Sequence, residues 1–235
     1  MTAQLLKLES APDLAEQVYR ALLDAISEGS LAPGQRITQE DLAEQLAVSR
    51  QPVTQALRLL KKDGFVQDAP GRGLQVTPLD ASWIAQVYQV RGALDALAVR
   101  LAAERRTRLD PALFVRGRAA VARGDVKGMI EADLAFHRAL YQASDNPLIE
   151  QSALLHWHHI RRAMGETLQT SALREPVWDE HEAIAQAVAE GDAERAEQIM
   201  RGHNDRASRH LDHGLQARSG RADETVTATL NSVVR

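Results

Sequence analysis

The sequence contains no cysteine, which excludes disulfides and thiolate metal sites. Aromatic residues make up only 4% of the chain, and alanine and leucine dominate its 44% of hydrophobic residues. This composition is typical of helices rather than of a β-sandwich. The N-terminus does not resemble a signal peptide, and no apolar run approaches membrane-spanning length. With a mean hydropathy of −0.32, the chain is predicted to be cytoplasmic, with no membrane partner.

An excess of basic charge is also missing. The net charge is −4; the first 80 residues carry 8 basic and 11 acidic side chains, and the rest carry 20 and 21. Nucleic-acid binding would therefore depend on a local cluster and a motif. From Ser49 to Lys62 there are four basic side chains and no acidic one: Arg50, Arg58, Lys61 and Lys62. Charge alone favours an ordinary solvent-exposed cationic face here.

The length of 235 residues suggests one large domain or two ordinary ones, and residues 10–78 have the pattern of a winged helix-turn-helix. Thr38 and Asp41 resemble a capping box, and Ser49 is predicted to cap the next helix. The predicted elements are helices from 14 to about 28, 38 to 46 and 49 to 63, and strands over 65–67 and 74–76. The order and spacing of these elements favour DNA binding where charge alone does not.

The third predicted helix carries side chains that suit the major groove. Its cations can meet phosphates, and Ser49 and Gln51 lie near its N-terminus. Gln51, Thr54 and Gln55 can reach base edges.

Spaced motifs in residues 10–78 resemble the DNA-binding domain of the GntR family. They are Gly29-Ser-Leu-Ala-Pro-Gly34, Glu40-Asp-Leu-Ala43, Val48-Ser-Arg-Gln-Pro-Val53, Ala56-Leu57 and Gly71-Arg-Gly73. The resemblance implies that the following residues face DNA: Arg36, Arg50, Arg58, Arg72 and Gly73. The family commonly has Arg-Glu where this chain has Thr54-Gln55. Because that arginine can bind guanine bidentately, we predict an operator that differs from the family's commonest pattern.

Residues 82–217 have a helical pattern throughout, which predicts an all-α bundle. The candidate segments are 82–106, 110–123, 125–144, 146–169, 173–190 and 192–217. Residues 218–235 are predicted to form a polar, loosely ordered tail. The predicted fold is thus mainly α, with an N-terminal winged helix-turn-helix and a C-terminal helical bundle.

All eight histidines follow residue 136. Asp133 and His137 lie one helical turn apart and so share a face, and His181 and His203 lie on two later predicted helices. Three imidazoles and a carboxylate suit Zn, Ni, Mn or Fe(II). Spacing alone is weak support, because a lone histidine on a helix is more often packed or exposed than ligating. His156 and its neighbour Trp157 are interpreted as structural rather than as pocket lining.

Further motifs resemble the ligand-binding (FCD) domain of the FadR-type branch of GntR regulators. They are Arg91-x-x-Leu-Asp95, Asp133-Leu-Ala-Phe-His137-Arg-x-Leu, Ala143-Ser-Asp-Asn-Pro-Leu148, Glu180-His181-x-x-Ile184, Gly191-Asp192 and Met200-x-x-His203. In metal-containing members, the positions that match Asp133, His137, His181 and His203 hold a divalent cation. The resemblance therefore implies a metal here.

Arg91 lies on the apolar stripe of the segment 82–106, where a cation needs a partner or an anion. One interpretation is an internal ion pair with Glu131 or Asp95. The other is a clamp for a carboxylate ligand whose remaining oxygens bind the metal. The family resemblance favours the second.

Together these features predict a homodimeric transcription regulator of a palindromic operator, controlled by a small organic acid. Repression that the ligand relieves is the commoner arrangement in such families. A direct metal sensor and a purely structural metal stay open as alternatives. A metal-dependent enzyme is a weaker one, since the chain has no His-Glu-x-x-His motif and a winged domain would be unexplained. The chain is predicted not to be an enzyme.

Overall fold

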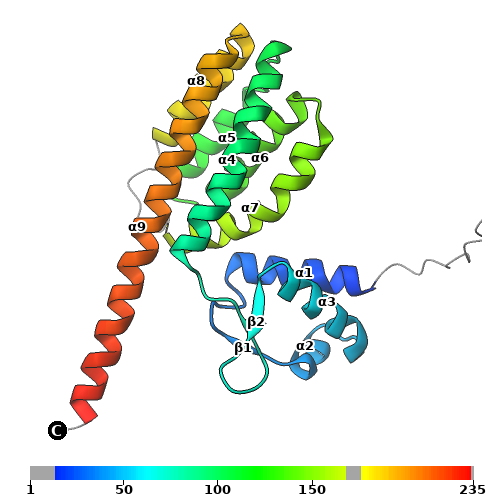
Figure 1. Cartoon of the computed structure of the whole chain (residues 1–235), viewed down its shortest axis with the longest axis vertical. Coiled ribbons are helices and arrows are strands. Elements are labelled where there is room, and N and C mark those ends of the chain that lie inside the picture. The colour runs from blue at the N-terminus through cyan, green and yellow to red at the C-terminus, as the bar shows by residue number, and fades with distance from the viewer. Residues whose placement is uncertain (1–13, 168–175, 234–235) are drawn as a thin grey trace, which may run out of the picture. The chain divides into compact units, whose positions relative to one another are not determined.

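The computed structural model of the chain describes residues 14–167 and 176–233 (Figure 1). It divides into two compact units, Met1–Pro78 and Leu79–Arg235. The N-terminal unit combines short helices with a small sheet, and the described part of the C-terminal unit is helical. The predicted fold class is confirmed.

The N-terminal unit is a winged helix-turn-helix. Its elements are α1 (Leu14–Glu28), β1 (Arg36–Ile37), α2 (Gln39–Gln45), α3 (Arg50–Lys62), β2 (Val66–Asp68) and β3 (Leu74–Val76). The strands form one antiparallel sheet in the order β1-β3-β2, with Arg36 opposite Gln75 and Val66 opposite Val76. Strand β1 was not predicted, because two residues are too short to show an alternating pattern.

Local capping sets where the helices of this unit begin. The Thr38 hydroxyl accepts a hydrogen bond from the backbone N–H of Asp41 at 3.1 Å, as the capping-box pattern predicts. Ser49 occupies the N-cap position of α3 with an extended backbone, but its side chain makes no capping hydrogen bond. Its hydroxyl is exposed and is therefore available to an outside partner.

The core of the unit lies between α1, α3 and the sheet. Four of its side chains come from α3 and the start of the hairpin and are at most 2% exposed: Val53, Leu57, Leu60 and Phe65. Two adjacent leucines of α3 differ sharply, because Leu59 is 44% exposed whereas Leu60 is fully buried. This contrast gives a test of which face of α3 supports the fold.

Leu60→Ala should lower the free energy of unfolding of this unit by about 3 kcal/mol, because it removes buried methyl groups and leaves a cavity. Leu59→Ala should change it by no more than about 0.5 kcal/mol. Scanning calorimetry of the two variants measures the difference. Equal effects would mean that α3 does not bury the face described here.

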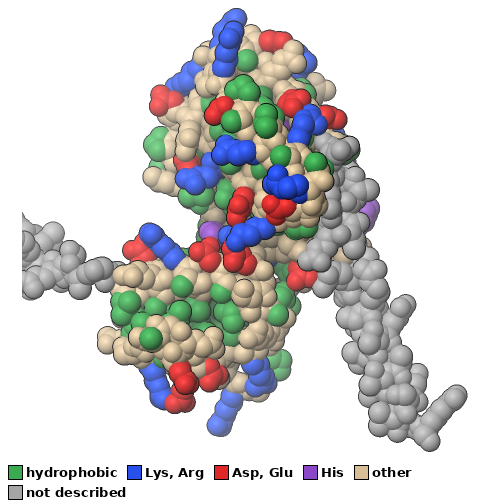
Figure 2. Space-filling view, turned by 180° about the vertical axis from the view of Figure 1, so that it is seen from behind, with side chains coloured by type: hydrophobic (Ala, Val, Ile, Leu, Met, Phe, Trp, Pro, Cys, Tyr) green, Lys and Arg blue, Asp and Glu red, His purple; other side chains and the backbone are tan. Residues whose placement is uncertain are grey.

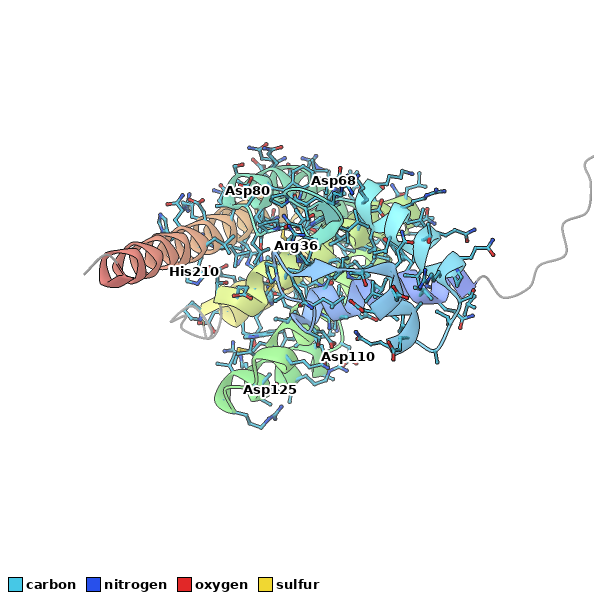
Figure 3. All side chains as sticks on the ribbon, turned by 90° about the horizontal axis from the view of Figure 1, so that it is seen from below. Arg36, Asp68, Asp80, Asp110, Asp125 and His210 are labelled. Atoms are coloured by element: carbon cyan, nitrogen blue, oxygen red, sulfur yellow. The ribbon has the colours of Figure 1, made fainter. Side chains whose placement is uncertain are left out.

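The C-terminal unit is a bundle of helices. They are α4 (Ala81–Glu104), α5 (Ala112–Ala122), α6 (Val126–Ala143), α7 (Pro147–Thr167), α8 (Pro176–Glu190) and α9 (Ala193–Val233). Helices α4 and α9 run side by side (Figure 1). Asp80 and Asp125, both labelled in Figure 3, cap α4 and α6 by accepting backbone N–H groups of the first turn. Among the described residues, no helix is long and apolar enough to cross a membrane.

The end of the chain differs from the prediction. The last helix was expected to stop near residue 217 and to be followed by a loose tail, but α9 continues to Val233. An existing helix adds one hydrogen bond for each residue fixed and needs no new nucleus, so low hydrophobicity by itself does not end it. The expected helical residues 168–169 and 173–175 lie outside the described part.

Candidate functional site

Helix α3 presents one polar face. Gln51, Gln55 and Arg58 are exposed, and Thr54 is half-exposed. Spacings of three and four residues place them together on the side opposite the buried Leu60. The sequence predicted that these residues meet DNA, Arg58 at phosphates and the other three at base edges, and the fold brings them onto one surface.

Helix α2 supports this face through two contacts that sequence reasoning missed. Arg50 pairs with Glu40 across the turn between the helices. The Thr54 hydroxyl lies 3.0 Å from Gln39 Oε1 and 2.9 Å from the backbone carbonyl oxygen of Arg50. Gln39 and Glu40 therefore adjoin the residues expected to meet DNA. Only the general rule that α2 packs beside α3 in this fold could have indicated them.

The wing is held by Arg36. Its guanidinium donates to the backbone carbonyl oxygens of Pro70, at 2.6 Å, and Arg72, at 3.3 Å. Gly71 and Gly73 have φ of +89° and +93°, which L side chains rarely adopt. The Arg72 side chain is exposed at the tip. Arg36 thus stabilises the loop that carries Arg72, in addition to any contact that Arg36 itself makes with DNA.

Basic and acidic residues are nearly balanced in number, 28 against 32. On the face seen in Figure 2, basic and acidic side chains are interspersed over the C-terminal unit. This agrees with the net charge of −4. A DNA contact therefore depends on the local cations of α3 and the wing.

The four predicted metal ligands come together inside the C-terminal unit. Asp133 and His137 lie on α6, His181 on α8 and His203 on α9. All four are buried, and one ligand atom from each lies within 4.8 Å of the others. His181 Nε2 lies 3.3 Å from Asp133 Oδ1, so these two atoms are close enough to bind the same metal ion. The geometry therefore brings together the complete set taken from the sequence.

Two of the three imidazoles of this cluster lack hydrogen-bond partners of their own in the described part of the chain. Within the described residues, both ring nitrogens of His137 and of His181 are buried without a hydrogen bond. Burial lowers the pKa of His137, and it holds the pKa of His181 well below its ordinary value. Both rings are thus neutral at neutral pH, which is the form that binds a metal. Orphaned buried nitrogens of this kind are costly unless something outside the chain satisfies them.

Carboxylates lie behind two of the rings. His203 Nδ1 donates to Glu180 Oε2 at 2.9 Å, and Glu180 also accepts from Arg206 at 2.6 Å. His137 Nδ1 lies 3.7 Å from Asp95 Oδ1. In both cases the other nitrogen, Nε2, is left for the cluster. Carboxylates in this position fix ring orientation and tautomer in metal sites.

The His181 ring is held by its packing. It stacks on Phe136 with centroids 4.0 Å apart, and Trp178 meets it edge-on at 4.8 Å. Helix α5 comes close enough to hold Trp178 only because residue 117 is glycine: a Cβ there would lie 1.9 Å from the indole. The ring is therefore placed before any ligand arrives.

Arg91 is buried beside the cluster, at 2% exposure. Its Nε lies 3.3 Å from Asp95 Oδ2, and its guanidinium lies over the Trp157 ring at 4.6 Å. Burial opposes the charge, but the combined attraction of Asp95, Tyr141, Tyr88 and Asp133 outweighs it and raises the pKa of Arg91. Asp95 also accepts from the Tyr141 hydroxyl at 2.5 Å. The ion pair considered with Asp95 is therefore present, although Arg91 Nη2 has no hydrogen bond to any described residue.

A small cavity reaches two of the cluster residues. It has a volume of about 80 Å³, and its lining is mainly apolar. The lining includes Asp133 and His203 together with Tyr88, Met129, Trp178 and His210. Arg91 and Trp157 do not line it. Sites for drug-sized ligands are several times larger, so this cavity suits only a small molecule.

Comparison with known proteins identifies both units. Residues 14–76 match the family described as bacterial regulatory proteins, gntR family, and residues 86–206 match the FCD domain. The regulator YdhC of Bacillus subtilis is 30% identical over 89% of this chain and 96% of its own length. The chain belongs to the GntR family. This GntR regulator has the FadR-type architecture, a helix-turn-helix domain followed by an FCD domain.

Other relatives agree. LutR of Bacillus subtilis, an HTH-type transcriptional regulator, is 31% identical over 76% of this GntR chain and 92% of its own length. The structure of McbR/YncC from Escherichia coli shares the fold, with a TM-score of 0.70 at 24% identity over 87% of this chain and 98% of that one. The protein is thus a DNA-binding transcription regulator, not an enzyme.

Proposed function

We propose that this GntR regulator is a homodimeric repressor that binds a palindromic operator and is controlled by a small organic acid bound at a divalent metal. The observation that carries the control mechanism is the cluster of Asp133, His137, His181 and His203. Four buried ligand groups converge there, and two of the rings have no other partner. Such a set fits Zn, Ni, Mn or Fe(II).

The DNA-binding half of the proposal rests on the polar face of α3. Gln51, Thr54 and Gln55 would read base edges, while Arg50, Arg58 and Arg72 would meet phosphates. In a two-fold dimer, two such helices would enter successive major grooves, which requires a palindromic site.

The metal would supply a Lewis acid that binds a carboxylate oxygen of the ligand. Arg91 would also attract the anion. Its Nη2 makes no hydrogen bond to any described residue, and a guanidinium binds a carboxylate well. Because Asp95 already pairs with Arg91, the acid would have to compete with Asp95 or share the guanidinium. The small cavity beside Asp133 and His203 suits a compact acid, and because Arg91 does not line it, the acid would have to extend beyond the cavity to reach the guanidinium.

Control requires that the acid bind one arrangement of the dimer better than the other. Helix α4 carries Arg91 and also begins the C-terminal unit directly after the wing domain. A shift of α4 on ligand binding would therefore change the spacing of the two DNA-binding units. Release of the operator is the direction that we propose.

Band shifts on the DNA upstream of the gene test this function. Purified protein should retain metal and bind this DNA, and a panel of small hydroxy acids, sugar acids and dicarboxylates should include one that weakens binding. If the protein did not bind this DNA even at low salt, the proposal that its operator lies upstream of its own gene would be wrong. Operator affinity that follows free metal concentration without any acid would instead identify a direct metal sensor.

Glu180→Gln should weaken metal binding by about 10- to 100-fold, because it removes the carboxylate that orients His203. Glu182→Gln is the matched control: it lies on the same helix and contacts Arg118 instead. Chelator competition measures both affinities. Equal affinities in the two variants would show that Glu180 does not position a metal ligand.

A further inference from the structure

The first turn of α2 holds two side chains of α3. The consecutive residues Gln39 and Glu40 belong to α2, which packs beside α3 (Figure 1). Gln39 contacts the Thr54 hydroxyl, and Glu40 pairs with the Arg50 guanidinium. Thr54 follows Arg50 by one helical turn, so the two contacts are neighbours on α3. Both α3 side chains are therefore placed by protein contacts before DNA arrives.

The Thr54 hydroxyl is occupied within the protein. Its Oγ1 lies 2.9 Å from the backbone carbonyl oxygen of Arg50 and 3.0 Å from Gln39 Oε1. Both neighbours are acceptors, and a hydroxyl carries a single proton. That proton is donated inside the protein, whichever of the two oxygens it meets. Thr54 thus has no hydrogen-bond donor to offer to a base.

The γ-methyl group is the part of Thr54 that remains for an outside partner. The side chain is half-exposed, and branching at Cβ makes its first torsion stiff. The two contacts of the hydroxyl fix that torsion, which also fixes the position of the methyl group. In the major groove, thymine is the standard base that carries a methyl group, and a threonine methyl group is one of the apolar groups that contact it.

The side chains around Thr54 also suit an A·T pair. Gln51 precedes Thr54 by three residues and Gln55 follows it directly, and both glutamines are exposed. A glutamine amide can bind adenine bidentately through N6 and N7 of the base. An A·T pair therefore offers a methyl group to Thr54 and a hydrogen-bonding edge to either glutamine.

We propose that Thr54 recognises a thymine in each half-site of the operator through its γ-methyl group, and that Gln39 positions Thr54 for this contact. The inference rests on the proposed function, in which α3 enters the major groove of a palindromic site. It adds the identity of one recognised base and a residue of α2 that acts through Thr54. With Gln39 removed, one of the two acceptors that hold the hydroxyl is lost, and the hydroxyl can turn to several kinds of base.

Replacing thymine by uracil in the operator tests the contact, because it removes only the methyl group. The full-length protein first selects its operator from a pool of random DNA duplexes. Each thymine is then replaced at the matching positions of both half-sites, and the dissociation constant is measured by fluorescence anisotropy. At one position the replacement should weaken binding by about 15-fold, which is about fourfold for each methyl group that is buried. Thymines at the other positions serve as internal controls.

Two variants separate the methyl group of Thr54 from its hydroxyl. Thr54→Ser keeps the hydroxyl alone, so the preference for thymine over uracil at that position should disappear. Thr54→Val keeps a γ-methyl group without the hydroxyl, so most of the preference should remain. The preference, rather than the affinity, is the quantity compared, because it isolates the interaction between the two groups. The opposite pattern would show that the hydroxyl recognises the base, and a preference that survives in both variants would assign the thymine to another residue. Either result would overturn the role given to the Thr54 methyl group.

Gln39→Ala tests the positioning role. The preference for thymine over uracil should fall to less than about half of its wild-type value. Affinity for unrelated DNA should not change, since it comes from phosphate contacts. Gln45→Ala is the matched control, because Gln45 is an exposed glutamine at the other end of α2. An unchanged preference in Gln39→Ala, or an equal loss in both variants, would show that Gln39 does not position Thr54.

The outcomes distinguish this inference from the proposed function. A protein that selects an operator with no uracil-sensitive position would make the thymine contact wrong and leave the regulator, its metal and its acid standing. A protein that selects no sequence from the pool at any salt concentration would overturn operator binding itself, and the inference with it.

Discussion

His181→Ala is expected to reduce the affinity for a divalent metal by at least about 100-fold. Loss of a carboxylate behind a ligand already costs about 10- to 100-fold, and this change removes a ligand itself. The ring is fully buried between Phe136 and Trp178, so no solvent-exposed group can take its place. The response of operator binding to the organic acid should be lost together with the metal.

Chelator competition and thermal unfolding, measured with and without metal, test this expectation. His213→Ala is the control, because His213 is an exposed histidine of α9 outside the cluster. A folded His181→Ala protein that still binds the operator but ignores the acid would support a cofactor role. Wholesale unfolding would make the metal structural. An unchanged metal affinity would remove His181 from the site.

The sequence could predict this cluster because part of it is local. Asp133 and His137 are one turn apart, and any helix brings them to one face. His181 and His203 were joined to them by family-like motifs, since no helical periodicity can show which helices meet in a bundle. The groups that contact the ligands were harder to predict from the sequence. Glu180 is a surface-like acidic residue in the sequence, and only the approach of α8 to α9 turns it toward His203.

Arg91 shows a different limit of sequence reasoning. A cation on an apolar stripe predicts a buried partner, and Asp95 was one of the two acidic residues considered. The choice between them depends on side-chain direction: Asp95 is one turn away on the same helix. That Asp95 also contacts His137 and Tyr141 follows only from the packing of α4 against α6. The guanidinium is thereby connected to the metal cluster through one carboxylate.

In the DNA-binding unit, the features that the sequence could predict are those with local causes. The Thr38 cap and the wing hairpin depend on neighbours a few residues away. The contact of Arg36 with the wing joins residues more than thirty positions apart, which no local pattern contains. The pairing of Arg50 with Glu40, ten positions apart, is likewise not part of any local pattern, and this pair leads to an expectation about DNA affinity.

Arg50→Ala should weaken operator binding by roughly 100-fold at about 0.1 M salt, because each half of a dimer loses one charge-assisted hydrogen bond to a phosphate. The plot of log affinity against log salt should become less steep by about two, one for each phosphate that the variant dimer no longer neutralises. The loss of affinity should be similar for specific and unrelated DNA, since a phosphate contact carries no sequence information. Fluorescence anisotropy over a salt series measures all three quantities.

Glu40→Gln should act in the opposite direction. In the free protein Glu40 holds the Arg50 guanidinium, so phosphate must displace a carboxylate that then lies unpaired near DNA. Removing its charge should strengthen binding severalfold, while Arg116→Ala, an exposed arginine of α5, should have no effect. If Glu40→Gln weakened binding instead, Glu40 would be serving to position Arg50 rather than to compete for it. If neither Arg50→Ala nor Glu40→Gln changed the salt slope, α3 would not meet the phosphates through Arg50. The cationic cluster would then be the ordinary solvent-exposed face that its charge alone suggests.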